Sequence, residues 1–182
     1  MNPAVKAFMI SESFLWPAWN FMAPIMAIFA ANSIEHGTIE TAGFAYSIHL
    51  IIRVIFELIS GKMLAGSHTR RKITVIISGI AILSLAYLFL AYIHTIMQLF
   101  IAFGIAGMGF GIIAPAKNSL FASHLDKDKE TLEWGIADAT VFITIALAAS
   151  LGGLIAGKYG FHVFFTLSAW VNTLAAFPYI VS

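Results

Sequence analysis

Residues 73–93 read ITVIISGIAILSLAYLFLAYI, an apolar stretch without a charged side chain. A transmembrane helix needs about 20 mostly apolar residues, which is the length of this stretch. Further stretches of similar length lie on both sides of it, so the sequence predicts six membrane-spanning helices. Their expected ranges are near 7–31, 41–64, 73–93, 96–116, 134–157 and 162–181.

The composition of the whole chain leads to the same prediction. Hydrophobic residues make up 60% of the 182 residues and charged residues only 10%, whereas soluble domains have about 45–50% and about 25%. We therefore expect an all-α polytopic membrane protein. It would be a six-transmembrane-helix bundle forming a single domain over 1–182, with the lipid bilayer as its partner. The composition excludes a disordered chain and a soluble enzyme domain.

The sequence contains no motif of an enzyme or of a cofactor site. It lacks H-E-x-x-H, G-x-S-x-G, the P-loop and the dinucleotide fingerprint, so we expect no catalytic residues, no cofactor and no metal. The absence of cysteine excludes thiolate metal sites and cysteine nucleophiles. A formal net charge of +1 leaves no basic face for a nucleic acid.

Basic residues near the ends of spans predict how the chain is oriented, because they are retained on the cytoplasmic side. One side of the predicted bundle has only Lys158. The other side collects Lys6, Lys62, Arg70, Arg71, Lys72, Lys117, Lys127 and Lys129. We therefore expect both termini to be cytoplasmic.

The second span carries polar side chains at helical spacing. His49, Arg53 and Glu57 are four residues apart, so they share one helix face. A charged group near mid-bilayer is costly unless it is paired or faces water, and Glu57 is one turn from Arg53. The pair either fixes helix packing or lines a cavity that binds solute or protons. His49 is either a packing residue or a group that titrates near neutral pH.

The first span has a similar set, in which Glu12, Trp16 and Asn20 step by four. Glu12 either lines a cavity or extends to the membrane interface, and Trp16 either packs or binds a ligand. Pro17 and Pro24 are expected to bend this span. In the fifth span, Asp138 is either a carboxylate favoured by the start of its helix or a cavity residue.

Small residues mark the surfaces where helices are expected to pack closely. The fourth span reads GIAGMGFGIIAP over 104–115, and Pro115 is expected to end or kink it before a polar stretch at 117–133. The predicted packing positions are Gly104, Gly107, Gly111, Gly153 and Gly157.

The order of these features resembles one six-helix half of a major facilitator superfamily transporter. GKMLAGSHTRRK at 61–72 is similar to the loop motif of the family's cytoplasmic gate, which the motif's aspartate helps to latch. The expected gate-loop residues are Gly61, Arg70, Arg71 and Lys72, at the matching positions. WGIADA at 134–139 and LGGLIAGKYGFHVFF at 151–165 follow in the family's order. The motif's aspartate is replaced by Ala65 or Gly66, and the fourth-span arginine and fifth-span proline are absent.

The resemblance, which extends to short bacterial chains of this type, implies a secondary transporter in the inner membrane of a bacterium that moves a small solute by alternating access. Standard members have two six-helix halves with the substrate near the midplane between them. The chain is thus expected to be a half that forms a homodimer or joins a second half, a fragment of a twelve-span protein, or a non-transporting scaffold. The expected pathway residues are Glu12, Trp16, Asn20, His49, Arg53, Glu57 and Asp138. Glu57 or Glu12 is the first choice as a proton carrier and His49 the second. The substrate and the coupling ion stay open.

Overall fold

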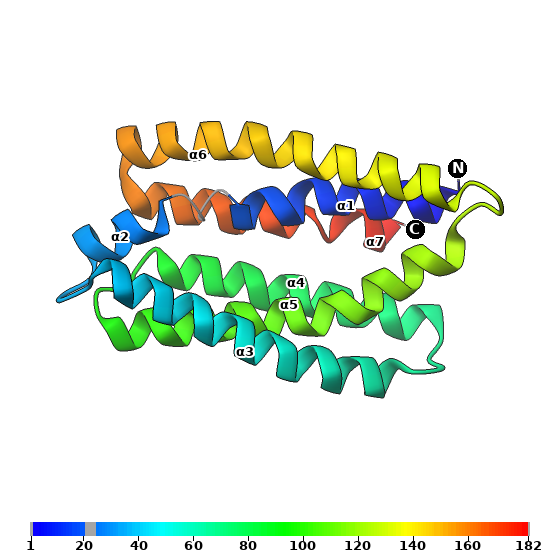
Figure 1. Cartoon of the computed structure of the whole chain (residues 1–182), viewed down its shortest axis with the longest axis horizontal. Helices are drawn as coiled ribbons and strands as arrows, with labels where there is room; N and C mark the ends of the chain where they lie inside the picture. Colours follow the sequence, from blue (N-terminus) through cyan, green and yellow to red (C-terminus); the bar gives the residue numbers. More distant parts are fainter. Residues whose placement is uncertain (1, 21–24, 182) are drawn as a thin grey trace.

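The structure, a computed structural model, describes residues 2–20 and 25–181. This part of the chain is helical, and its helices lie roughly side by side in a bundle (Figure 1). The helices are α1 (Pro3–Asn20), α2 (Met26–Ser33), α3 (Ile39–Leu64), α4 (Thr69–Leu90), α5 (Ile96–His124), α6 (Glu130–Leu174) and α7 (Phe177–Val181). The predicted all-α fold class is therefore confirmed.

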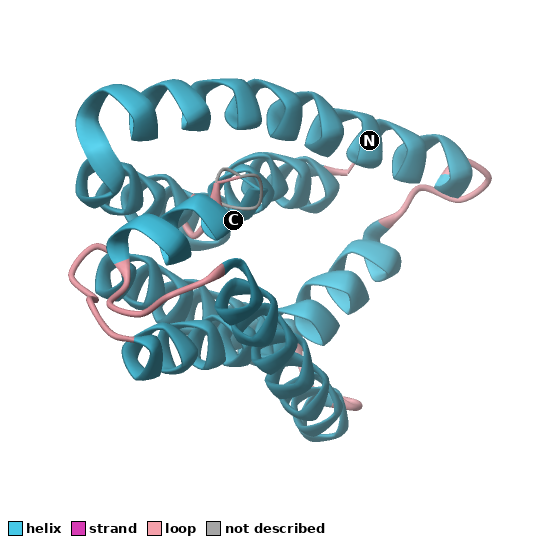
Figure 2. Ribbon diagram, turned by 60° about the vertical axis from the view of Figure 1, so that its left-hand side comes forward, coloured by secondary structure: helices cyan, strands magenta, loops and turns pink. Residues whose placement is uncertain are grey.

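Helix α6 consists of two arms that run in opposite directions. Its backbone leaves the helical region at Gly160, where φ is 81° and ψ is 169°, a conformation that is open to glycine and strained for other residues. Figures 1 and 2 show the chain turning back after the first arm, at one end of the bundle. The arms 130–159 and 161–174 therefore correspond to the predicted spans 134–157 and 162–181.

Four helical segments in the described part are long and apolar enough to cross a membrane. They are Ile39–Leu64, Thr69–Leu90, Ile96–His124 and Glu130–Ile180. The last one includes both arms of α6 and so supplies two crossings. The predicted span 7–31 corresponds to α1 and α2, whereas residues 21–24, with Pro24 among them, lie outside the described residues. Pro17 lies inside α1.

Helix α5 corrects the predicted end of the fourth span. The helix continues through Pro115 to His124, so the polar stretch predicted at 117–133 has only residues 125–129 outside a helix. Proline removes one helical hydrogen bond, but neighbouring helices can compensate inside a membrane protein. Ala114, Ala116 and Lys117 are all buried, so packing holds this part of α5 in helical form.

Glycines let α5 pack closely against α3 and α4. A Cβ on Gly107 would meet the carbonyl oxygen of His49, and a Cβ on Gly104 would lie 3.0 Å from the Ile52 side chain. Gly109 has a similar relation to Leu83 on α4. A Cβ at Gly153 or Gly157 meets nothing within 4 Å among the described residues, so close packing at these two positions stays a prediction. The interleaved positions Ala148 and Gly152 are buried instead.

The two ends of the bundle differ in charge as the sequence predicts. The start of α1, the end of α7 and the loops after α3 and α5 lie at one end (Figure 1). These segments and the adjoining helix ends carry Lys6, Lys62, Arg70, Arg71, Lys72, Lys127 and Lys129. Lys117, which the sequence analysis placed with them, is buried within α5, and Lys158 precedes the Gly160 turn at the opposite end.

Asn172 connects α6 to α4 inside the bundle. It is fully buried, and its Nδ2 donates to the Ile80 carbonyl oxygen at 3.0 Å and to Ser84 Oγ at 2.8 Å. Interhelical hydrogen bonds of this kind contribute about 0.6–1.7 kcal/mol in membrane proteins.

We expect Asn172→Leu to lower the free energy of unfolding by about 1 kcal/mol or more, measured by denaturation in detergent. Thr166→Val, which removes an exposed hydroxyl from the same arm, should have a smaller effect, and equal effects would contradict this role.

Candidate functional site

A charged cavity lies between α1, α3, α5 and the first arm of α6. It has a volume of ≈390 Å³ and combines charged and amide side chains with aromatic walls. Its polar lining residues are Glu12, Asn20, Arg53, Glu57, Lys117, Asn118 and Asp138. Trp16 also lines it, so the cavity brings together every predicted pathway residue except His49.

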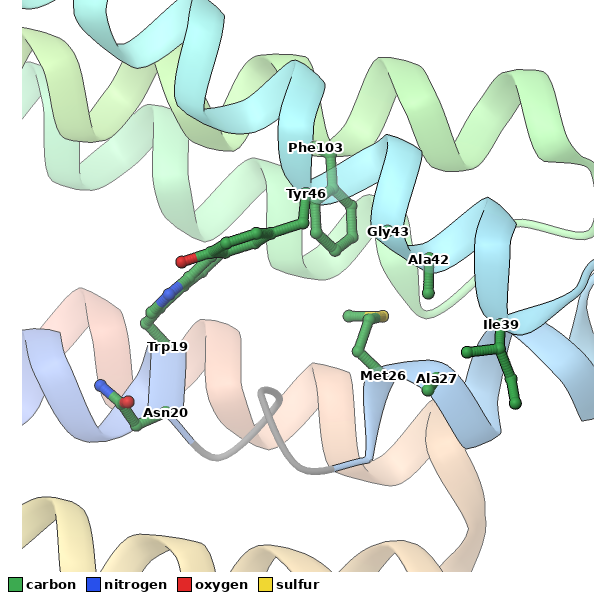
Figure 3. A pocket seen from close by; sticks show the side chains of 9 residues that line it. All are labelled: Trp19, Asn20, Met26, Ala27, Ile39, Ala42, Gly43, Tyr46 and Phe103. Atoms are coloured by element: carbon green, nitrogen blue, oxygen red, sulfur yellow. The ribbon is translucent and has the colours of Figure 1, made fainter.

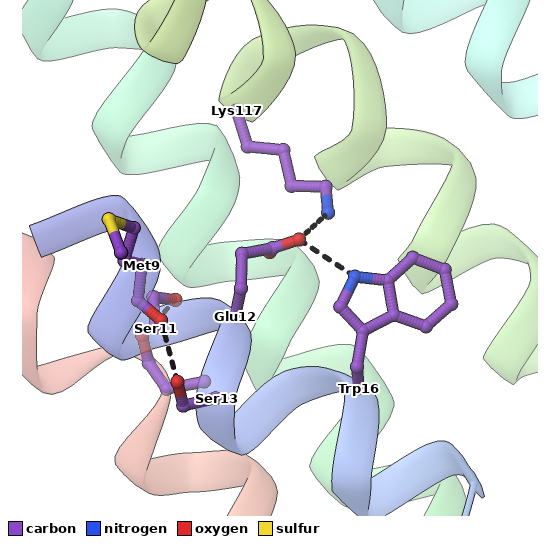
Figure 4. A network of polar contacts seen from close by, with 7 residues as sticks. Met9, Ser11, Glu12, Ser13, Trp16 and Lys117 are labelled. Atoms are coloured by element: carbon purple, nitrogen blue, oxygen red, sulfur yellow. Dashed lines mark hydrogen bonds and ion pairs between the residues drawn. The ribbon is translucent and has the colours of Figure 1, made fainter. Parts of the chain in front are cut away.

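A buried ion pair joins α1 to α5 on the cavity wall. Lys117 Nζ donates to Glu12 Oε2 at 2.6 Å, and Trp16 Nε1 donates to the same oxygen at 2.7 Å (Figure 4). Glu12 is 3% exposed and Lys117 is 6% exposed. The alternative in which Glu12 extends to the membrane interface is therefore wrong, because its carboxylate is held inside the bundle.

The positions of these residues follow from their helices. Glu12 and Trp16 are one helical turn apart on α1, so their side chains can meet. Lys117 reaches them because α5 continues beyond Pro115. Its ammonium group also lies 5.2 Å from the Trp16 ring centre and 5.8 Å from that of Phe8, in reach of a cation–π attraction.

One carboxylate oxygen of this cluster is unused. Glu12 Oε1 is buried and has no hydrogen-bond partner among the described residues. A buried acceptor without a partner is unfavourable, so this atom is a place where a proton, a water molecule or a donor group of a solute would be stabilised. The cluster can therefore hold an ion pair and receive one further donor.

Arg53 and Glu57 form a second ion pair on α3. The closest distance is 3.6 Å, between Nε and Oε2, and the two side chains are 28% and 41% exposed. The Arg53 guanidinium group lies 5.5 Å from the Phe110 ring centre. This pair is more accessible than the first, so its charges can exchange partners more readily.

Asp138 differs from the other cavity carboxylates. It lies on the first arm of α6 and is exposed toward the cavity. Within the described part of the chain it has no ion pair or hydrogen bond. Its carboxylate is therefore available to a group from outside the chain.

His49 lies in an aromatic cluster and not in the charged cavity. Its ring stacks on Trp19 at 4.4 Å between centres, the residue is buried, and its carbonyl oxygen faces Gly107. Among the described residues, its Nδ1 has no hydrogen-bond partner. These contacts favour the packing alternative for His49.

A second cavity lies beside this aromatic cluster. It has a volume of ≈410 Å³ and lies between α3, the end of α1 and the start of α2, and Figure 3 shows Trp19 and Tyr46 along one side of it. Its described lining residues carry no charge, and most are apolar. We place the candidate pathway in the charged cavity, because intramembrane charges mark functional sites more reliably than apolar space does.

The predicted gate loop connects α3 to α4 at the basic end. Lys72 Nζ donates to Ser119 Oγ on α5 at 2.7 Å, whereas Arg70 and Arg71 are exposed. Gly61 lies beside Pro115, since a Cβ there would be 3.8 Å from the proline ring. The loop thus contacts α5 through one lysine and leaves two arginines free for other partners.

Sequence reasoning missed Lys117, which it assigned to a polar loop. The signal that could have found it is the apolar pattern after Pro115, where Ala116, Leu120 and Phe121 continue the buried face of α5. A lysine on that face would then have been recognised as an intramembrane charge in need of a partner.

The sequence was compared with models of protein families and with curated proteins. The sequence model of the Major Facilitator Superfamily matches residues 7–181. The proton-coupled antiporter flippase LtaA of Staphylococcus saprophyticus is 24% identical over 138 residues, which cover 74% of this chain and 33% of the flippase.

Solved structures of two transporters have a similar fold. The POT family transporter PepTSo matches with a TM-score of 0.75 and 18% identity, over 100% of this chain and 37% of the other. An auto-inhibited POT family peptide transporter matches with a TM-score of 0.74 and 19% identity, over 98% of this chain and 36% of the other. The chain thus spans about one third of the length of each of these proteins.

Proposed function

Because this chain belongs to the major facilitator superfamily, an integral membrane family of transporters, we propose that it forms one half of a solute transporter whose pathway is the charged cavity. The observation that carries this proposal is the buried pair of Glu12 and Lys117 on the cavity wall. Charges inside a membrane are costly and face a bundle interior or a water-filled cavity. The cavity contains five charged side chains, more than a purely structural bundle needs.

The second half is proposed to cover α3 and the first arm of α6. The share of residues that are buried was compared within an apolar 18-residue stretch of each segment. It is 17% in α3 and 11% in Glu130–Ile180, against 56% in α5. α3 and the first arm of α6 both border the cavity, so a second bundle placed against them would enclose it. Facilitator halves are related by an axis along the membrane normal. A second copy of this chain with both termini on the same side satisfies that symmetry, and a separate or covalently linked half does so too.

Alternating access would then act on the two ion pairs. A second bundle that rocks against this one opens the cavity to one side of the membrane at a time. Glu12 supports proton coupling because one of its oxygens is free to receive a proton while the other holds Lys117. Glu57, in the more exposed pair, is the second candidate carrier. His49 is no longer favoured, since it lies in the aromatic cluster.

Arg53→Ala tests the pathway with little risk to folding. The pair of Arg53 and Glu57 is partly exposed, and such pairs contribute only about 0–1 kcal/mol to stability. We therefore expect the variant to fold with an unchanged melting temperature and to lose solute-dependent transport in proteoliposomes. Lys62→Ala, which removes an exposed cation from the same helix outside the cavity, is the matched control. Full transport in a folded Arg53→Ala variant would contradict the proposed pathway.

Assembly is tested by counting copies in lipid nanodiscs with native mass spectrometry. A parallel dimer supports a transporter made from two copies. A strict monomer excludes self-assembly and requires a second half of different sequence. Arg70 and Arg71 are exposed and form no ion pair with another described residue. They support the alternative of a non-transporting scaffold, because the gate aspartate that they would contact is missing from the loop. A monomer whose cavity excludes water would favour that alternative.

A further inference from the structure

We propose that the charged cavity selects a solute with one positive charge on an apolar body, and that Asp138 is the carboxylate that binds the charge. This inference rests on the proposed transport pathway and specifies the chemical class of its solute. It comes from the balance of charge in the cavity, from the position of Asp138 on α6, and from the aromatic side chains around it.

The charges of the cavity do not cancel. Three carboxylates and two cations line it. Lys117 is committed to Glu12 at 2.6 Å, and Arg53 to Glu57 at 3.6 Å. Asp138 is left without a cation in the part of the chain that the structure describes. The cavity therefore has one excess negative charge.

This excess charge ranks the possible solutes. A cationic group beside Asp138 neutralises a carboxylate that would otherwise be unpaired within the membrane, where that state is costly. A neutral solute leaves the carboxylate unpaired and removes water from it. An anionic solute must compete with Glu12 or Glu57 for a cation and also experiences repulsion from Asp138. A cation is thus the only class for which binding improves the balance of charge.

The side chains around Asp138 fit an organic cation. Trp134 and Phe142 lie one helical turn before and after Asp138, so the three side chains share one face of α6. Both rings line the cavity, and they are 40% and 67% exposed. The Trp134 ring is fixed from behind by Phe121, at 4.5 Å between centres. A carboxylate between two accessible aromatic rings can attract a cation through both ionic and cation–π interactions.

Another part of the cavity lining already holds a cation in this manner. The ammonium group of Lys117 lies between a carboxylate and the rings of Trp16 and Phe8. The groups on α6 repeat this chemistry without a cation of their own. The volume of ≈390 Å³ is in the usual range for small-molecule sites, about 300–1,000 Å³, so an alkyl or aryl ammonium ion fits.

The test uses the purified chain in nanodiscs of phosphatidylcholine. Benzyltrimethylammonium is titrated while the fluorescence of the tryptophans is recorded, and neopentylbenzene and phenylacetate serve as neutral and anionic probes of similar size. We expect saturable binding of the cation and weaker binding of the other two. Asp138→Asn should weaken the affinity for the cation about tenfold, as the loss of one ionic contact implies.

Matched variants separate this effect from unfolding. Asp138→Glu keeps the charge and should retain most of the affinity, whereas Glu130→Gln removes an exposed carboxylate at the start of α6, outside the cavity, and should change nothing. Binding of the cation that is unaffected by Asp138→Asn, or preference for the neutral or anionic probe, would overturn the inference. If phenylacetate binds best and Arg53→Ala abolishes that binding, the pathway stands and only the solute class is wrong. If no probe binds although the chain is folded, the inference fails.

Discussion

Lys117→Met should destabilise the protein more than any other single substitution in the cavity wall. The variant keeps the length of the side chain but leaves the Glu12 carboxylate buried without its cation. Breaking a buried ion pair by removing one partner costs about 3–5 kcal/mol. We therefore expect a large drop in melting temperature in detergent and little folded protein in the membrane.

A double variant separates charge from packing. Glu12→Gln combined with Lys117→Met removes both charges and restores a neutral interior, so stability should recover most of the loss. Lys158→Met, at the exposed lysine near the Gly160 turn, controls for the loss of a positive charge and should unfold like the unmodified chain. A Lys117→Met variant as stable as this control would mean that Glu12 and Lys117 do not depend on each other.

Gly111→Ala is the second substitution with a large expected effect. A Cβ at this position would lie 2.5 Å from the carbonyl oxygen of Arg53 and 3.0 Å from the backbone nitrogen of Glu57. Backbone atoms cannot rotate away, so α3 and α5 would have to separate along the helix that carries the second ion pair. Overpacking of this kind typically costs about 1–3 kcal/mol, although alanine is intrinsically a better helix former than glycine.

The chain offers a matched control for this substitution. Gly153→Ala adds the same methyl group to another membrane helix, at a site where a Cβ meets nothing within 4 Å. Its free energy of unfolding should stay the same or rise slightly. Denaturation of the two variants side by side in detergent measures the difference, and equal stabilities would contradict the close packing of α3 on α5.

Most of the fold follows from local sequence patterns. Apolar runs of membrane length identify the long helices, and the short polar segments between them force successive helices to reverse direction. The fourth span was predicted to end too early, because a proline ends a helix only when its surroundings do not compensate, and α5 continues through Pro115 to His124. The open surroundings of Gly153 could not be inferred from the sequence either, since a repeat of small residues does not tell which face meets a neighbour within the same chain.

The candidate site was partly predictable. Charges within apolar stretches identified Glu12, Arg53 and Glu57, because such charges are costly without a partner. The partner of Glu57 is on the same helix and could be inferred from spacing. The partner of Glu12 is Lys117, 105 residues along the chain, and no local pattern reveals such a contact. His49 resembles a cavity residue in spacing, but the rings that surround it come from two other helices, α1 and α5, as well as from its own helix.

Cysteine accessibility in membranes tests most directly whether the charged cavity is a solvent-filled pathway. The chain has no cysteine, so single substitutions report on one position each. Val141→Cys lies on the cavity wall, and Leu85→Cys lies on the outer face of α4, where the leucine is exposed to the bilayer. In vesicles treated with a charged, membrane-impermeant maleimide, we expect rapid labelling of Val141→Cys that the solute slows, and no labelling of Leu85→Cys until the membrane is dissolved. Protection of both positions would contradict the transport pathway.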